Sequence, residues 1–422
     1  MSATNLVGNL RQLADAALQA TACGDYATAQ QRYQQAVALA PDNSTLLYNY
    51  ASLARIMGDL DQAQALLDKV IGLTPADSSA WLMRSQLRRW SSSNNHLDAL
   101  TNALQQLPDN ASPRQRVELH YALCKEYEDC ENFSKAREHL EAGAALKRRH
   151  INYDVNDDLT TLAALKRAVT APTPKPSHPE SHGQPTPIFI ISLPRAGSTL
   201  LERMLACDSA VHAAGELPYF PQLLGRALQH AYINANGPKS RPRTKAELVS
   251  YADNIDWLQL GRDYLAQLPQ HSWVIDKLPL NYLNIGVIRR ALPQARIIYL
   301  QRDAGDHELA LLKHLFNQAY PWSYDRQEIS RYRQAVEELF NEAYEKPGND
   351  IHRLTYEQLV TQPSKTLTAV TDYCGLQWDE SMLQQALRFN ETNQQPSTTG
   401  SSSQIRHSLH SRSIGLAKRY RS

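Results

Sequence analysis

A 34-residue repetition near the start of the chain constrains its fold more than any other feature of the sequence. The run Gly24-Asp25-Tyr26 recurs as Gly58-Asp59-Leu60, and Ala29 recurs at the same offset as Ala63. Small residues at fixed positions let two helices approach closely, and a single helix pair cannot bury its own apolar face. The spacing therefore predicts pairs of antiparallel helices that stack along the chain.

Prolines follow the same period, since Pro41 recurs as Pro75. Proline cannot continue a helix, so it falls after the second helix of each unit. A third unit, which runs to Pro108, is degenerate, and a fourth shows in Asn132-Phe133 and Ala136. These landmarks are the signature of tetratricopeptide repeats, with a generic helical bundle as the alternative. Arrays of this kind are scaffolds with a concave groove.

A proline-dense stretch separates the repeats from the rest of the chain. Residues 171–187 contain six prolines, which favours extended chain over helix. We therefore expect a helical repeat array over residues 1–170, a semi-rigid linker over 171–187 and a second domain over 188–422.

The pattern changes to alternating strands and helices after the linker. Short apolar runs at residues 188–191, 273–275 and 296–300 have the length of buried strands, and 351–355 is a weaker fourth. The helical segments between them indicate crossovers. The expected fold class is thus an all-α tetratricopeptide-like helical repeat array followed by an α/β P-loop-like domain with a mostly parallel sheet.

Basic residues follow three of the predicted strands. Arg195 comes after the first, Lys277 after the second and Arg302 after the third. In open α/β sheets, ligands bind beyond the carboxyl ends of the strands. Cations in such a crevice are costly unless an anion neutralises them. The sequence therefore predicts a polyanionic ligand at this edge of the sheet.

The turn after the first strand is suited to holding an oxyanion. Gly197 lets backbone amides face the ligand at a helix N-terminus, and Ser198 and Thr199 add hydroxyl donors. A structural turn with a helix cap is the alternative reading. The Walker pattern G-x-x-x-x-G-K-[ST] is absent, which argues against an ATPase or kinase. A nucleotide-dependent phosphotransferase would require Mg²⁺.

Several ordered segments resemble one known family. Pro194–Leu201 (PRAGSTLL) is similar to the 5′-phosphosulfate loop of sulfotransferases, and Ala214–Pro218 (AGELP) resembles a segment of bacterial sulfotransferases that carry tetratricopeptide repeats. The match extends through segments at residues 276–282, 291–303, 356–360 and 374–378. It covers essentially the whole chain, and the second domain is also distantly similar to tyrosylprotein sulfotransferases.

The resemblance implies an enzyme that moves a sulfuryl group from 3′-phosphoadenosine-5′-phosphosulfate to a hydroxyl acceptor, by in-line attack and without a metal. It assigns Glu216 as the general base, Lys277 as the cation near sulfur and the leaving oxygen, and Arg302 as the ligand of the 3′-phosphate. The donor would also be held by Arg195, Ala196, Gly197, Ser198, Thr199 and Tyr356, with Ser402 and Lys418 in a basic C-terminal segment that closes over the nucleotide.

One departure from the family pattern concerns the 3′-phosphate. Ala310 stands where the family usually has a serine, so one charge-assisted hydrogen bond is lost. Such a bond stabilises a complex by roughly 1.5–3 kcal/mol. A weakened sulfotransferase-like protein that serves as a peptide-binding scaffold is therefore the alternative function.

Composition restricts the partners and the location. The net charge of +1 gives no argument for nucleic acid, and no run of 18 apolar residues predicts a membrane span. Five scattered cysteines argue against a disulfide framework and for a reducing compartment, so we expect a cytoplasmic protein. The acceptor stays open between a peptide tyrosine, a sugar or glycan, and a small alcohol or phenol; the repeats favour an extended acceptor.

Overall fold

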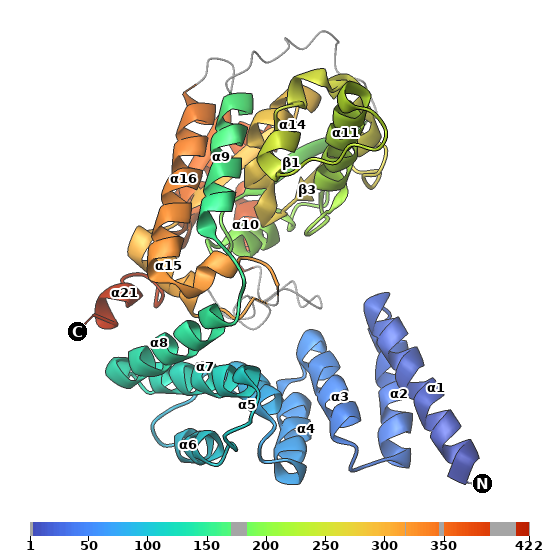
Figure 1. Ribbon diagram of the computed structural model, residues 1–422, viewed down its shortest axis with the longest axis vertical. Coiled ribbons are helices and arrows are strands. Elements are labelled where there is room, and N and C mark those ends of the chain that lie inside the picture. The colour runs from blue at the N-terminus through green and yellow to red at the C-terminus, as the bar shows by residue number, and fades with distance from the viewer. Residues whose placement is uncertain (1–2, 170–183, 317, 346–349, 389–410, 422) are drawn as a thin grey trace. The chain divides into compact units, whose positions relative to one another are not determined.

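The computed structural model describes residues 3–169, 184–316, 318–345, 350–388 and 411–421 (Figure 1). The described chain forms two compact units, the first with residues up to Ile151 and 417–421, and the second with residues 152–388 and 411–416. Most of the expected linker lies outside the described residues.

The division between the units differs from the expected boundary at residue 170. Helix α9 (Val155–Val169) belongs to the second unit, where it packs beside α16 (Arg326–Tyr344), as Figure 1 shows. Its apolar spacing is that of one more repeat helix, but Leu162 and Leu165 are buried within the second unit. Helical periodicity alone does not say which neighbour covers the apolar face.

The first unit is built from helix pairs, as the repetition predicts (Figure 1). The pairs are α1 (Ala3–Ala22) with α2 (Tyr26–Leu39), α3 (Ser44–Met57) with α4 (Leu60–Leu73), and α7 (Pro113–Asp129) with α8 (Phe133–Arg149). Between the last two pairs, α5 (Ser78–Gln86) and α6 (Leu97–Gln105) both pack against α7. The tetratricopeptide-like array is thereby confirmed.

The recurring residues each have a structural role in the turn between paired helices. Gly58 has φ +90°, a left-handed conformation that favours glycine, and it ends α3. The side chain of Asp59 then accepts from the backbone N–H of Gln62 and caps α4. Ala63 is fully buried against α3, which explains why a small residue is needed there.

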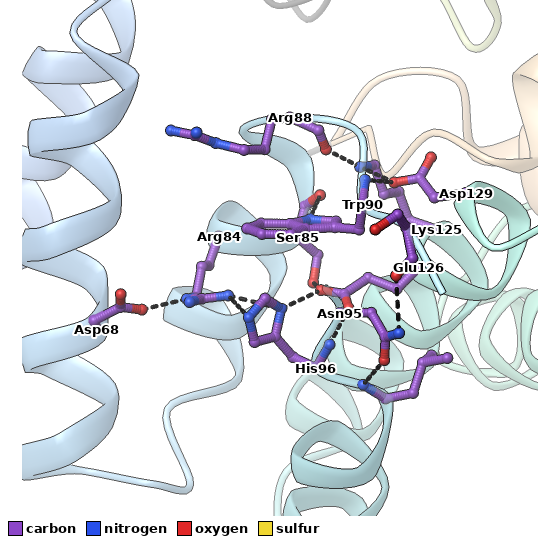
Figure 2. Close-up of polar contacts among 12 residues, drawn as sticks. Asp68, Arg84, Ser85, Arg88, Trp90, Asn95, His96, Lys125, Glu126 and Asp129 are labelled. Atoms are coloured by element: carbon purple, nitrogen blue, oxygen red, sulfur yellow. Dashed lines mark hydrogen bonds and ion pairs between the residues drawn. The ribbon is translucent and has the colours of Figure 1, made fainter. Parts of the chain in front are cut away.

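The degenerate third unit has a longer connection, residues 87–96, in place of the short turn. A buried polar network joins α4 to α7 across it (Figure 2). Arg84 bonds Asp68 and the ring of His96, and both oxygens of Glu126 accept hydrogen bonds, from Ser85 and from His96. The network supplies the helix-to-helix contacts that regular repeat residues make elsewhere.

The second unit contains a five-stranded sheet in the order β2-β3-β1-β4-β5, and every adjacent pair is parallel. The strands are β1 (Thr186–Ile191), β2 (Val211–Ala213), β3 (Trp273–Asp276), β4 (Arg296–Gln301) and β5 (Ile351–Thr355). The mostly parallel sheet is confirmed, and four of the strands were predicted. The sequence did not reveal β2, which is three residues long with only Val211 buried.

Helices cover this sheet and complete the core of the second unit. Ile188, Phe189, Ile190 and Ile191 on the central strand β1 are all fully buried. The remaining helical elements are α10 (Ser198–Leu205), α11 (Tyr219–Asn236), α12 (Lys245–Val249), η1 (Ala252–Asn254), α13 (Trp257–Leu265), η2 (Pro279–Asn284), α14 (Ile285–Ala291), α15 (Ala304–Leu312), η3 (Pro321–Tyr324), α17 (Tyr356–Thr361), α18 (Pro363–Cys374) and α19 (Glu380–Leu387), with α21 (Leu416–Arg419) near the C-terminus.

Candidate active site

All five strands deliver a candidate site residue to the same edge of the sheet. Because the strands are parallel, their carboxyl ends lie together. In sheet order, the residues that follow the strands are Glu216 after β2, Lys277 after β3, the loop 192–197 after β1, Arg302 after β4 and Tyr356 after β5. The sheet thus collects residues that are far apart in the sequence.

The loop after β1 has an unusual backbone. Arg195 has φ +68° and Gly197 has φ +106°, so two residues of this short turn adopt left-handed conformations. A left-handed residue other than glycine costs free energy, on the order of 1–3 kcal/mol, and persists only where its surroundings hold it. A Cβ on residue 197 would lie only 2.6 Å from the ring of Tyr356. Glycine is therefore required here both by φ and by close packing.

Arg302 is held by the backbone of this loop and of the C-terminal segment. Its Nη1 donates to the carbonyl of Arg195 at 3.0 Å, and its Nη2 donates to the carbonyl of Ser413 at 3.1 Å. The guanidinium lies over the ring of Tyr356, 4.7 Å from the centroid. Its buried Nε has no hydrogen-bond partner among the described residues. That donor is available to an anion.

Two guanidinium groups are close together at this point. Burial, and then the charge of Arg302, lower the pKa of Arg195 to about 10. Like charges in a buried place repel each other, and an anion bound beside both would relieve the repulsion. The convergence predicted from the sequence is therefore present in the structure for Arg195 and Arg302.

A buried histidine, His307, holds the loop after β1 through a hydrogen bond. His307 on α15 is 4% exposed, and its Nε2 lies 2.9 Å from the carbonyl of Pro194. Burial lowers the pKa of His307 to about 4, so the ring is neutral at physiological pH and Nε2 carries the proton that it donates. The sequence analysis did not identify this residue.

Lys277 and Glu216 form an ion pair at the next strands along the sheet. Lys277 is 1% exposed, and its Nζ donates to Oε1 of Glu216 at 2.7 Å. Backbone pairing aligns the two residues, because the N–H of Lys277 donates to the carbonyl of Gly215 at 2.8 Å. A second carboxylate, that of Glu202 on α10, lies 3.8 Å from Nζ. The sequence analysis also missed Glu202.

Asp276 supports Lys277 without pairing to it. The carboxylate of Asp276 accepts from the hydroxyl of Tyr264 at 2.9 Å and from the N–H of Leu278 at 3.2 Å. Complete burial raises the pKa of Asp276 to about 7. These bonds fix the end of β3 and hence the backbone that carries Lys277.

An aromatic segment lies near both halves of the site. His314 is half-buried and close to Arg195, and desolvation and then the charge of Arg195 lower its pKa to about 3. Burial and then the carboxylate of Glu216 raise the pKa of Tyr320. Between them, Phe316 contacts both rings edge-on, with centroids 4.5 and 4.8 Å away.

Of the two C-terminal residues predicted to contact the donor, Ser402 and Lys418, the structure describes Lys418. Ser402 lies outside the described residues. Lys418 is exposed on α21 among the residues of the first unit, and its contact with the donor stays a prediction. Within the described C-terminal residues, Ser413 lies at the site, and its hydroxyl oxygen is 2.8 Å from that of Tyr356. Ala310 is half-buried on α15.

Comparisons with known proteins agree on two families. Residues 187–380 match the family model described as "Sulfotransferase family", and residues 20–87 match that of the tetratricopeptide repeat. An uncharacterized protein of Aquifex aeolicus is 25% identical over 90% of this chain and 49% of its own length. Protein-tyrosine sulfotransferase 2 of Gallus gallus is 21% identical over 46% of this chain and 53% of its own length. The chain thus spans about half the length of these curated relatives.

Among solved structures, the sulfotransferase domain of the Synechococcus PCC 7002 olefin synthase is similar. It is 21% identical, and the match covers 60% of this chain and 99% of that domain, with a TM-score of 0.34.

Proposed function

Because residues 187–380 match the sulfotransferase family model and follow a match to tetratricopeptide repeats, we propose that the protein transfers a sulfuryl group from 3′-phosphoadenosine-5′-phosphosulfate to a hydroxyl acceptor. The observation that carries the proposal is the Glu216–Lys277 pair, 2.7 Å apart, at the same sheet edge as Arg195 and Arg302. In this proposal Glu216 is the base, and Arg195, Lys277 and Arg302 are the three cations that act on the same donor.

The reaction is a balanced exchange of one bond to sulfur. The acceptor oxygen bonds to sulfur, the bond between sulfur and the phosphate oxygen breaks, and the acceptor proton passes to Glu216. The products are a sulfate ester and 3′-phosphoadenosine 5′-phosphate. Negative charge grows on the leaving phosphate oxygen, which the ammonium of Lys277 stabilises. Positioning and electrostatics supply most of the catalysis, as in phosphoryl transfer.

The described residues fit such a donor. Arg195 and the amides of 196–199 face the 5′-phosphosulfate at the N-terminus of α10, where the helix dipole favours an anion. Arg302 binds the 3′-phosphate through the unpartnered Nε. Tyr356 packs on Gly197 and Arg302 and so shapes the nucleotide side of the site.

For the acceptor, a peptide tyrosine is the first candidate. The curated relatives that match the second unit include protein-tyrosine sulfotransferases. Phe316 and Tyr320 present aromatic surface near Glu216, which suits a phenol. The repeats would hold an extended acceptor, such as the remainder of the peptide. The cytoplasmic location expected from the cysteines stays a prediction; within the described residues, no helix is long and apolar enough to cross a membrane.

The test is a transfer assay with sulfur-labelled donor, a tyrosine-containing peptide and a metal chelator. We expect label in the peptide and release of 3′-phosphoadenosine 5′-phosphate, with no need for Mg²⁺. Turnover that required both Mg²⁺ and ATP would instead assign a phosphotransferase. Absence of turnover with every class of hydroxyl acceptor would leave the binding scaffold that Ala310 suggests.

A further inference from the structure

Glu202 is a buried carboxylate beside Lys277 that also takes a backbone hydrogen bond from Gly215. Glu202 lies one turn into α10, the helix that follows the loop after β1, and is 5% exposed. Burial raises the pKa of Glu202, and the charge of Lys277 opposes that rise. Its Oε1 has no hydrogen-bond partner among the described residues, and its Oε2 lies 3.8 Å from Nζ of Lys277. A buried carboxylate in this condition is costly unless it serves a purpose.

The two carboxylates around Lys277 are unequal. Glu216 makes a hydrogen bond of 2.7 Å, and its side chain is 47% exposed. Glu202 is too distant for a hydrogen bond, and its side chain is 7% exposed. Glu216 therefore stands on the open side, where an acceptor arrives, and Glu202 stands behind the lysine. One ammonium needs only one carboxylate for neutrality, so the second one is in excess.

The proposed reaction makes two demands on Lys277 that conflict. A carboxylate bonded to an ammonium is a poor base, so Glu216 must release Lys277 before it accepts the acceptor proton. The same ammonium must then reach the leaving phosphate oxygen. In between, a buried cation without a counterion would be destabilised. A carboxylate that stays behind Lys277 throughout removes this conflict.

We propose that Glu202 is a positioning residue for sulfuryl transfer: it holds the ammonium of Lys277 as a fixed counterion while that ammonium exchanges Glu216 for the leaving oxygen of the donor. The inference rests on the proposed function. No proton passes to Glu202, and no bond is made or broken at it. Its contribution is to turnover and not to affinity for the nucleotide.

The test compares Glu202→Gln, Glu202→Asp and a matched control, Glu308→Gln. Glu308 is a partly buried carboxylate on α15 of the same unit, and its Oε1 lies 3.6 Å from Nε of Arg333. Turnover is measured as release of 3′-phosphoadenosine 5′-phosphate from the donor, with the tyrosine peptide or with water as acceptor. Affinity is measured by titration with 3′-phosphoadenosine 5′-phosphate, and folding by the thermal transition.

We expect Glu202→Gln to lower kcat about tenfold or more, with nucleotide Kd changed less than about threefold. Glu202→Asp, which keeps the charge, should recover part of kcat, and Glu308→Gln should leave kcat within about twofold of wild type. Wild-type kcat in Glu202→Gln would overturn the proposal. So would equal losses in Gln and Asp variants that are matched by lost nucleotide binding, since that pattern is purely structural. A wild-type protein without turnover would contradict the proposed function itself.

Discussion

Glu202 in the second unit differs from two buried carboxylates of the repeat unit in how far its hydrogen bonds are completed. In the repeat unit, Glu126 is fully buried, and both its oxygens accept hydrogen bonds, from Ser85 and His96 (Figure 2). Glu118 likewise accepts from two serine hydroxyls and from Arg114. In the second unit, one oxygen of Glu202 has no partner among the described residues. Its carboxylate has a backbone hydrogen bond from Gly215 and lies 3.8 Å from the ammonium of Lys277.

We infer that this difference in hydrogen bonding distinguishes buried charges that stabilise the fold from buried charges that act in binding or catalysis. A buried carboxylate whose oxygens are all bonded stabilises one arrangement of helices and offers nothing to a ligand. A buried group with unmet bonding capacity, beside cations that repel each other, is stable only if something else completes it. On the donor side, Nε of Arg302 has no partner among the described residues, and the charge of Arg302 lowers the pKa of Arg195.

The largest expected effect is at Glu216. Glu216→Gln removes the base but keeps the shape, so kcat should fall about 10²- to 10⁴-fold, a range typical of general-base loss. The affinity for 3′-phosphoadenosine 5′-phosphate should stay nearly unchanged, because the nucleotide is held by other residues. Steady-state kinetics and calorimetry check the two halves of this prediction. Full turnover in the variant would show that Glu216 is not the base.

Arg302 should affect binding rather than turnover. Arg302→Met keeps length and packing on Tyr356 but removes the charge. A hydrogen bond to a charged group contributes about 1.5–3 kcal/mol, so Kd for 3′-phosphoadenosine 5′-phosphate should rise about 10- to 100-fold. Adenosine 5′-phosphate is the control ligand, since it lacks the 3′-phosphate. Equal weakening of both nucleotides would place Arg302 elsewhere on the donor.

A substitution in the polar network of the repeat unit should lower stability and leave nucleotide binding unchanged. Glu126→Gln leaves the bonds of the network incomplete and should lower the free energy of unfolding by about 1–3 kcal/mol. The midpoint of thermal unfolding measures this loss. Nucleotide affinity should not change, because the network lies wholly within the first unit. A loss of nucleotide affinity without a loss of stability would break the distinction between the two kinds of buried charge.

The smallest effect is expected at Ala310. Ala310→Ser restores the hydroxyl of the family pattern on α15, and one added hydrogen bond should lower Kd for 3′-phosphoadenosine 5′-phosphate by about tenfold, the low end of the range for a bond to a charged group. Ala310→Val is a control that adds bulk without a donor. An equal gain from valine would show that packing, and not hydrogen bonding, limits affinity.

Much of the architecture was predictable from the sequence because its signals are local. The repeat period, the apolar runs that became β1, β3, β4 and β5, and the cations that follow three of them are all readable along the chain. The strand β2 was missed, because a three-residue strand with one buried side chain leaves no alternation to detect.

The missed site residues share a different cause. Glu202 on an amphipathic helix has the sequence signature of a solvent-facing residue, and only the fold brings Lys277 from 75 positions later to its side. His307 is hidden in the same way on α15, beneath the carbonyl of Pro194. Ser413 emerges only because the C-terminal segment returns to Tyr356. Local sequence patterns do not reveal contacts between segments that are far apart in the chain.

The most direct test of the account is a calorimetric titration of the whole protein with 3′-phosphoadenosine 5′-phosphate in a metal chelator, with adenosine 5′-phosphate as control. The account predicts binding that depends on the 3′-phosphate and is lost in a double variant of Arg195 and Arg302. Absence of binding to either nucleotide would contradict it, because the cations at the sheet edge would then bind no sulfuryl donor.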